Sequence, residues 1–243
     1  MEERAILPWL SVSEPVSSLS HLASAIVVAL LASRLLEKAG PDRRRRRAVW
    51  LYLFGVGGMF VASGTYHFLD NESPHRDLFW RLDHAMIWCT IAGTISAVQV
   101  LAGIALGWRG YVVWALAITG CTLEQLTLDG LSMWVSPMLY VGMGWYGLFP
   151  FFQLVRTQGL KFAMGVMRAG LTSTLGGVCD ALKWPEIWPG VIEGHEVMHV
   201  LIAWGMLQFY WAVTECANLP FAPYLEQAQA LAAEAESGPR AAE

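Results

Sequence analysis

Long apolar stretches alternate with short polar connections along most of the chain. A helix needs roughly 20 apolar residues to cross the hydrocarbon core of a bilayer, and each stretch is close to that length. The pattern predicts seven transmembrane helices, near residues 18–38, 48–69, 82–104, 109–127, 133–153, 163–181 and 194–214. Arg168 lies inside the sixth stretch. Because a charge at mid-bilayer is costly, we expect that helix to begin later, near Ala169.

The composition agrees with a membrane location. Hydrophobic residues make up 55% of the chain and charged residues only 15%, whereas charged residues reach about 25% in an ordinary soluble domain. The predicted fold class is therefore an all-α membrane protein, a seven-transmembrane helix bundle in the cell membrane. The formal net charge of -4 is small, and no basic groove with interleaved aromatic residues is present, which argues against nucleic acid as a partner.

The same pattern divides the chain into three parts. Residues 1–17 form an N-terminal segment, residues 18–216 the seven-transmembrane helix domain, and residues 217–243 a polar tail rich in Ala, Glu and Gln. The first apolar stretch has no basic segment before it and no clear small-residue cleavage site, so we expect a retained helix and no cleaved secretory signal.

Basic residues favour one orientation in the membrane. With the loops numbered from the N-terminus, 12 of the 16 Lys and Arg residues lie on the side of loops one, three and five and of the C-terminus. The positive-inside rule then predicts a non-cytoplasmic N-terminus and a cytoplasmic C-terminus. The five consecutive arginines from Arg43 to Arg47 weigh most, and we interpret them as a topology anchor that contacts anionic lipid.

Three histidines at the ends of apolar stretches are candidate metal ligands. His195 and His199 are four residues apart, as are Ser63 and His67, and a helix projects such pairs from one face. Asp83 adds a carboxylate from a third helix. Three imidazoles with an open fourth position are the arrangement that a catalytic zinc needs to keep a bound water. In the predicted topology all of these residues lie on the non-cytoplasmic side, which suggests a single site.

Other polar residues near this side have less specific interpretations. His21 is either a partner of a metal ligand or a helix-packing hydrogen bond, and Glu14 either reaches a neighbouring loop or caps the first helix. His84 follows the candidate carboxylate directly and should point to a different face of its helix. Glu124 and Asp180 are acids near predicted helix ends, and we rank them behind that carboxylate as site residues.

Four motifs together resemble a known family. They are Ser63-Gly-Thr-Tyr-His67, Leu82-Asp83-His84, Ile91-Ala-Gly-Thr94 and Gly194-His195-Glu-Val-Met-His199. This set resembles the hemolysin III branch of the progestin and adipoQ receptor (adiponectin receptor-like) family, which belongs with the alkaline ceramidases to a superfamily of seven-helix membrane hydrolases. The likeness extends to the segment from Glu14 to His21 and covers most of residues 14–214.

The resemblance implies a zinc ion held by His67, His195 and His199, with Asp83 and Ser63 facing the zinc-bound water. Asp83 would then orient that water or accept its proton, and Ser63 would donate a hydrogen bond to the water or to a developing oxyanion. The implied activity is hydrolysis of an amide or ester bond in a membrane lipid. The adiponectin receptors carry their zinc on the cytoplasmic side, opposite to the side that the arginine count predicts here.

Two other functions remain open at this stage. The same histidines could bind a structural zinc in a non-catalytic receptor or sensor involved in membrane lipid homeostasis, with lipid as ligand in place of substrate. A pore or transporter is less favoured, because no inverted repeat is evident and the ionisable residues gather at one face of the membrane.

Overall fold

The computed structural model describes residues 12–126 and 135–220, and within them the chain is helical apart from its connections and one isolated β-bridge. The helices are α1 (Pro15–Ala39), α2 (Arg43–Phe68), α3 (Arg76–Leu101), α4 (Gly107–Leu126), α5 (Val135–Trp145), α6 (Leu148–Gln158), α7 (Leu160–Leu182) and α8 (Gly194–Ala217). Helices α5 and α6 together make one long apolar segment. The prediction of an all-α, seven-transmembrane helix bundle is confirmed.

Five of these segments are long and apolar enough to cross a membrane, namely α1, α2, α3, the α5 and α6 segment, and α8. Helices α4 and α7 have 20 and 23 residues, which is sufficient length, but they fall short in hydropathy. Residues 1–11, and the predicted polar tail from residue 221 onward, lie outside the described part of the chain.

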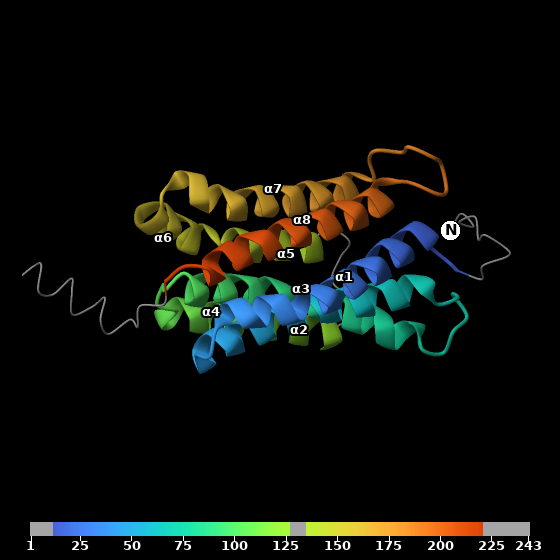
Figure 1. Cartoon of the computed structure of the whole chain (residues 1–243). Coiled ribbons are helices and arrows are strands. Elements are labelled where there is room, and N and C mark those ends of the chain that lie inside the picture. Colours follow the sequence, from blue (N-terminus) through green and yellow to red (C-terminus); the bar gives the residue numbers. More distant parts are fainter. Residues whose placement is uncertain (1–11, 127–134, 221–243) are drawn as a thin grey trace, which may run out of the picture.

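Figure 1 shows the helices running roughly along one common direction. Helix α2 packs along both α1 and α3, and α8 packs along both α7 and α1. One end of the bundle therefore gathers the start of α1, the connection between α2 and α3, and the connection between α7 and α8, at the right of the view (Figure 1). This arrangement brings the ends that carry the candidate histidines to the same side.

Two helices begin several residues earlier than hydropathy predicts. The second begins at Arg43, where the Asp42 side chain accepts hydrogen bonds from the amides of Arg44 and Arg45 and caps the helix. The third begins at Arg76, one residue before Asp77. Both helices begin with charged residues, and hydropathy locates the part of a helix that suits lipid, which is shorter than the helix itself.

The predicted helix over residues 133–153 and the predicted late start of the sixth helix are both wrong in detail. The segment predicted as one helix over residues 133–153 forms two helices, α5 and α6, separated at Tyr146 and Gly147. The predicted sixth helix, α7, runs unbroken from Leu160, with Arg168 inside it. Arg168 is exposed on the outside of the bundle and donates from its Nε to the carbonyl of Met164. An outward charge on a long side chain is compatible with a continuous helix, so it did not mark the helix start.

Glycines allow the backbones of α2 and α3 to touch. A Cβ added at Gly55 would lie 2.8 Å from the Cα of Thr90, and one added at Gly93 would lie 2.7 Å from the carbonyl oxygen of Leu51. Real Cβ atoms do not approach that closely, so only glycine permits this packing. The close contact fixes α3 against α2 and thereby places the side chains of Asp83 and Ser63 on adjacent helices.

A single arginine joins the opposite end of the bundle. Arg45 is buried, and its guanidinium donates to the carbonyls of Ala39, Leu101 and Ala217 at the C-terminal ends of α1, α3 and α8. The other four arginines of the run are exposed. The prediction that the run contacts lipid therefore needs a correction for Arg45, which is a structural member of the bundle.

Candidate metal centre

His67, His195 and His199 form a cluster at the end of the bundle where α2 finishes and α8 begins. Each of them offers one ligand nitrogen, and these three atoms all lie within 4.8 Å of one another. His67 and His199 are buried and His195 is half-buried. The structure thus brings together the three predicted histidines, and the group could hold a metal ion.

The start of α8 is held against the end of α7. A Cβ added at Gly194 would lie 2.4 Å from the carbonyl oxygen of Cys179, so only glycine fits where the two helices meet. Glu193 and Glu196 form a capping box that satisfies the first amides of the helix. The cap and the glycine together fix the direction in which His195 leaves the helix.

The start of α1 is joined to the end of α2. The amide of Glu14 donates to the carbonyl of His67 at 3.1 Å. The Ser13 hydroxyl donates to the carbonyl of Leu69 and the Ser18 hydroxyl to that of Gly64. The bond to His67 satisfies a carbonyl in the last turn of α2, which a helix end leaves without an intrahelical partner. These hydrogen bonds also place the side chain of Glu14 beside His67.

Each of the three histidines has a polar partner at its Nδ1 atom. The Nδ1 of His195 lies 2.9 Å from a carboxylate oxygen of Asp180, and that of His199 lies 3.1 Å from the Nε2 of His21. The Nδ1 of His67 lies 2.7 Å from a carboxylate oxygen of Glu14, a close ion-pair contact without the alignment of a hydrogen bond. A ring whose Nδ1 carries hydrogen has its lone pair on Nε2.

The Nε2 atoms of His195 and His199 lie 3.1 Å apart. Two nitrogens bound tetrahedrally to one zinc ion at the usual bond length of about 2.0–2.1 Å are separated by roughly 3.3 Å. The observed spacing is close to this value, and neutral imidazole nitrogens are ligands that zinc accepts. The three imidazoles therefore fit a zinc ion in chemistry, and the His195 and His199 pair also fits it in spacing.

Ser63 and Asp83 are buried beside the histidine cluster. Ser63 precedes His67 by one turn of α2, and its hydroxyl lies next to the carboxyl of Asp83 from α3. The Ser63 oxygen makes no hydrogen bond of good geometry with the described residues. Both residues line the same cavity as the three histidines. The structure places all five predicted site residues around one end of this cavity.

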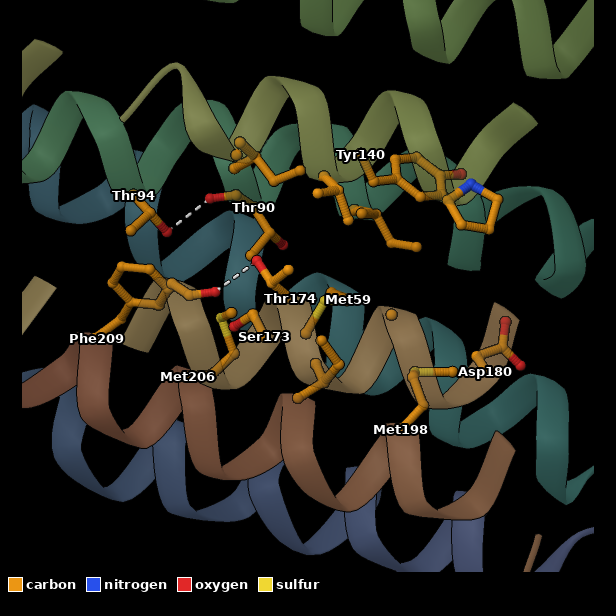
Figure 2. A pocket seen from close by; sticks show the side chains of 18 of the residues that line it. Met59, Thr90, Thr94, Tyr140, Ser173, Thr174, Asp180, Met198, Met206 and Phe209 are labelled. Carbon is orange, nitrogen blue, oxygen red and sulfur yellow. Dashed lines mark hydrogen bonds between the residues drawn. The ribbon is translucent and has the colours of Figure 1, made fainter. Parts of the chain in front are cut away.

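The cavity has a volume of about 570 Å³ and continues from the histidines into the bundle. Figure 2 shows Asp180 and Met198 near one end of it and Thr94 and Phe209 near the other. All eight described helices contribute to its walls, which are mainly apolar. The cavity suits a long apolar ligand with its polar group at the histidine end.

Four hydroxyl groups along this cavity are already satisfied by their own helices. Thr90, Thr94, Ser173 and Thr174 each donate to the carbonyl four residues earlier, and the bond between Thr94 and Thr90 is visible in Figure 2. A hydroxyl bonded in this way presents little unsatisfied polarity to a ligand. The wall therefore behaves as an apolar surface despite its threonines and serine.

Two polar residues considered from the sequence lie outside the histidine cluster. The Nδ1 of His84 hydrogen-bonds the carbonyl of Trp80, one turn earlier in α3. Glu124 is buried and accepts hydrogen bonds from the indole of Trp88 and the hydroxyl of Tyr140, which joins α3, α4 and α5. Glu124 stabilises the contact between these helices and lines the cavity wall.

The sequence did not predict which residues contact the Nδ1 atoms of the three histidines. Asp180 was ranked behind Asp83, His21 had a helix-packing alternative, and Glu14 was expected either to reach a neighbouring loop or to cap the first helix. One signal was available, because Glu14 and His21 are seven residues apart, which places them on the same face of α1 two turns from each other. No comparable spacing connects Asp180 with His195.

The fold and this cluster define a class, a multi-pass helical membrane protein with a candidate metal centre at one end of its bundle. A model of the family described as haemolysin-III related matches residues 10–210. The match covers most of the chain, which therefore belongs to the haemolysin-III related family. The resemblance noted from the four sequence motifs is confirmed.

Proposed function

We propose that the protein is a zinc-dependent hydrolase of amide or ester bonds in membrane lipids. The observation that carries the proposal is the placement of His67, His195, His199, Asp83 and Ser63 at one end of a long cavity with mainly apolar walls. The polar group of a lipid would lie among these residues, and its acyl chain would extend along the cavity.

His67, His195 and His199 would hold the ion. When bound, zinc supplies a Lewis acid, which lets water lose a proton near neutral pH and so become a nucleophile for a carbonyl group. Three nitrogen ligands leave a fourth position open, as catalytic zinc sites do. Cavity space on the side of Ser63 and Asp83 is available to water and to the scissile carbonyl.

Asp83 and Ser63 then have separate roles. Hydrolysis joins the oxygen of water to the carbonyl carbon, breaks the bond to nitrogen or oxygen, and releases a fatty acid together with an amine or alcohol. Asp83 accepts the proton that water loses and returns it to the leaving group. Ser63 donates a hydrogen bond to the negative charge that develops on the carbonyl oxygen.

The dimensions of the cavity agree with an acyl chain. His195 and Phe209 both line it, and their separation along α8 is roughly 21 Å at 1.5 Å per residue. Because the threonine and serine hydroxyls of the wall are satisfied internally, burying methylene groups there is favourable at about 0.8 kcal/mol each.

We place the catalytic end of the bundle on the non-cytoplasmic side and the C-terminus in the cytoplasm. The distribution of 12 Lys and Arg residues against 4 supports this orientation. Cysteine introduced at exposed Leu78, near the histidine end, should react with a membrane-impermeant maleimide in intact cells. Labelling only after the cells are opened would reverse the orientation.

The proposed activity is tested with purified, zinc-loaded protein and lipid amides or esters presented in mixed micelles, by measuring released fatty acid. Asp83→Asn should lower kcat by about 100-fold or more, because general acid–base catalysis contributes at least that factor. His84→Asn is a matched control from the next position, and it should keep most of the activity. Zinc-loaded wild-type protein that releases no fatty acid from any lipid amide or ester would contradict the proposal.

One observation favours a second candidate, a receptor or sensor with structural zinc. The histidines and their Nδ1 partners come from α1, α2, α7 and α8, so an ion bound there would connect the ends of four helices. In that case zinc would stabilise the protein against unfolding, Asp83→Asn would leave lipid binding intact, and no lipid would be cleaved.

A further inference from the structure

We propose that Glu14, Asp180 and His21 are positioning residues that hold the three histidines with Nε2 toward the ion. This inference rests on the proposed zinc centre and adds the residues that orient its ligands. Metal-bound histidines generally donate their second ring N–H to a carboxylate, a carbonyl or another acceptor, which fixes the tautomer and the ring orientation. The structure provides such a partner for every ring of the cluster.

Asp180 positions His195 from the last turn of α7. Its Oδ1 lies 2.9 Å from the Nδ1 of His195 and 3.3 Å from the ammonium of Lys183. The same carboxylate oxygen lies between the His195 ring and the Lys183 ammonium. His195 thus donates from Nδ1 to an acceptor on another helix, and its Nε2 lone pair is free to bind the ion.

Glu14 positions His67 from the start of α1 through a close ion-pair contact. One carboxylate oxygen lies 2.7 Å from the Nδ1 of His67, and the other lies 3.8 Å from the guanidinium of Arg76. The backbone of Glu14 is fixed as well, because its amide donates to the carbonyl of His67. The site therefore contains two parallel chains, Arg76 to Glu14 to His67 and Lys183 to Asp180 to His195.

His21 completes the set with a neutral partner. It is buried, packs edge to face against Phe60, and places its Nε2 3.1 Å from the Nδ1 of His199. If the Nε2 of His199 binds the ion, its Nδ1 must carry the hydrogen and donate to His21. His21 then accepts at Nε2, and its own hydrogen is on Nδ1. Zinc binding thus determines the hydrogen position on both rings.

The three partners are not equivalent. Two are carboxylates, one next to Arg76 at the start of α3 and the other next to Lys183 at the end of its own helix, and the third is an imidazole packed between Phe60 and His199. Removing such a partner typically lowers metal affinity by about 10- to 100-fold. We expect the larger losses at Asp180 and Glu14, since a charged acceptor makes the stronger hydrogen bond. We expect the smallest loss at His21.

The experiment measures zinc affinity by competition with a chromophoric chelator, using full-length protein in detergent. The variants are Asp180→Ala, Glu14→Ala and His21→Ala, together with Asp180→Asn, Glu14→Gln and His21→Gln, which keep an acceptor near Nδ1. Asp77→Ala is the matched control, because Asp77 is an exposed acid at the same end of the bundle that pairs with Arg81 instead of a histidine. The visible spectrum of the cobalt(II) form reports the ligand geometry independently of turnover.

Affinity should fall by about 10- to 100-fold in Asp180→Ala and Glu14→Ala, recover in part with Asn and Gln, and stay at the wild-type level in Asp77→Ala. The cobalt spectrum should change in the alanine variants. If an alanine variant fails to fold, the Asn or Gln variant at that position carries the test through the same spectrum. Wild-type affinity and spectrum in all six variants, with zinc binding intact, would overturn this inference alone. Failure of the wild-type protein to bind zinc would overturn the proposed function as well.

Discussion

The two ends of the bundle are joined by opposite kinds of chemistry. At one end a guanidinium, Arg45, donates to carbonyls at the C-terminal ends of three helices. At the other end three imidazoles converge, with acceptors behind two of them and a further imidazole behind the third. The arginine end contains its own permanent cation, whereas the histidine end presents lone pairs that a cation from outside the chain would bind.

This difference assigns the arginine end to the stability of the fold and the histidine end to the candidate site. Helix C-termini carry unsatisfied carbonyls and the negative end of the helix dipole, so a buried arginine there is fully used by the fold. At the histidine end, the Nδ1 atoms of His195 and His199 are hydrogen-bonded within the chain and that of His67 lies against the Glu14 carboxylate, while the Nε2 atoms of His195 and His199 lie 3.1 Å apart beside the cavity. The comparison predicts that the histidine end responds to metal and that the arginine end does not.

The largest effect is expected from His195→Ala. It removes one of three ligands together with the contact to Asp180, and two remaining imidazoles form a poor zinc site. Zinc content measured by mass spectrometry should fall from about one ion per chain to a small fraction of that. His75→Ala, in the exposed connection before α3, serves as the control and should retain its zinc. Equal zinc content in the two variants would place the metal elsewhere.

The next effect concerns stability at the arginine end. Arg45→Met leaves three carbonyls without their donor and should lower the free energy of unfolding by about 3 kcal/mol. The loss should be the same with and without zinc, as measured by chemical denaturation in detergent. Arg46→Met changes an exposed neighbour and should remain within about 0.5 kcal/mol of wild type. A loss at Arg45 that depends on zinc would mean that the two ends are coupled.

A smaller and more local effect is expected from Gly194→Ala. The added methyl group would lie 2.4 Å from the carbonyl oxygen of Cys179, so α8 must shift and carry His195 away from Asp180. Zinc affinity should fall by roughly 10-fold, as for the loss of a ligand's hydrogen-bond partner. Gly142→Ala is matched to it, because nothing lies within 4 Å of its added methyl group, and it should bind zinc like wild type. The same affinity in both variants would show that the helix contact does not set the ligand geometry.

The smallest effect is expected at the edge of the arginine end. Lys38 donates to the side chain of Asn218, and this hydrogen bond is exposed. Lys38→Ala should lower the free energy of unfolding by at most about 0.5 kcal/mol, again regardless of zinc. A loss near that of Arg45→Met would show that the exposed contact, and not the buried guanidinium, joins α1 to α8.

The sequence predicted the middle of most helices and missed where several of them begin. Apolar runs mark the part of a helix that suits lipid, so the first turns at Arg43 and Arg76, which begin with charged residues, were left out. The break at Tyr146 and Gly147 was also missed, because the residues on both sides of it are apolar. Arg168 led to the prediction of a helix start near Ala169, which is wrong because its outward side chain does not interrupt α7.

For the site, spacing within one helix was informative and contacts between helices were not. The pairs four residues apart identified His67, His195 and His199, and these three nitrogens lie together in the structure. The contact between His21 and His199 joins residues 178 positions apart. It depends on how α1 packs against α8, which no local pattern records. Glu14 does occupy the N-cap position of α1, but its side chain makes no capping hydrogen bond and contacts His67 instead.

The most direct test of the zinc centre is an experimental structure of the zinc-loaded protein, with anomalous scattering measured at the zinc edge. We predict one zinc ion bound by the Nε2 atoms of His67, His195 and His199, with a fourth position that faces the cavity and holds no protein atom. Absence of zinc from this cluster would contradict the proposed zinc centre. A fourth protein ligand, such as the Glu14 carboxylate that lies 3.8 Å from the Nε2 of His195, would contradict the catalytic proposal and favour a structural ion.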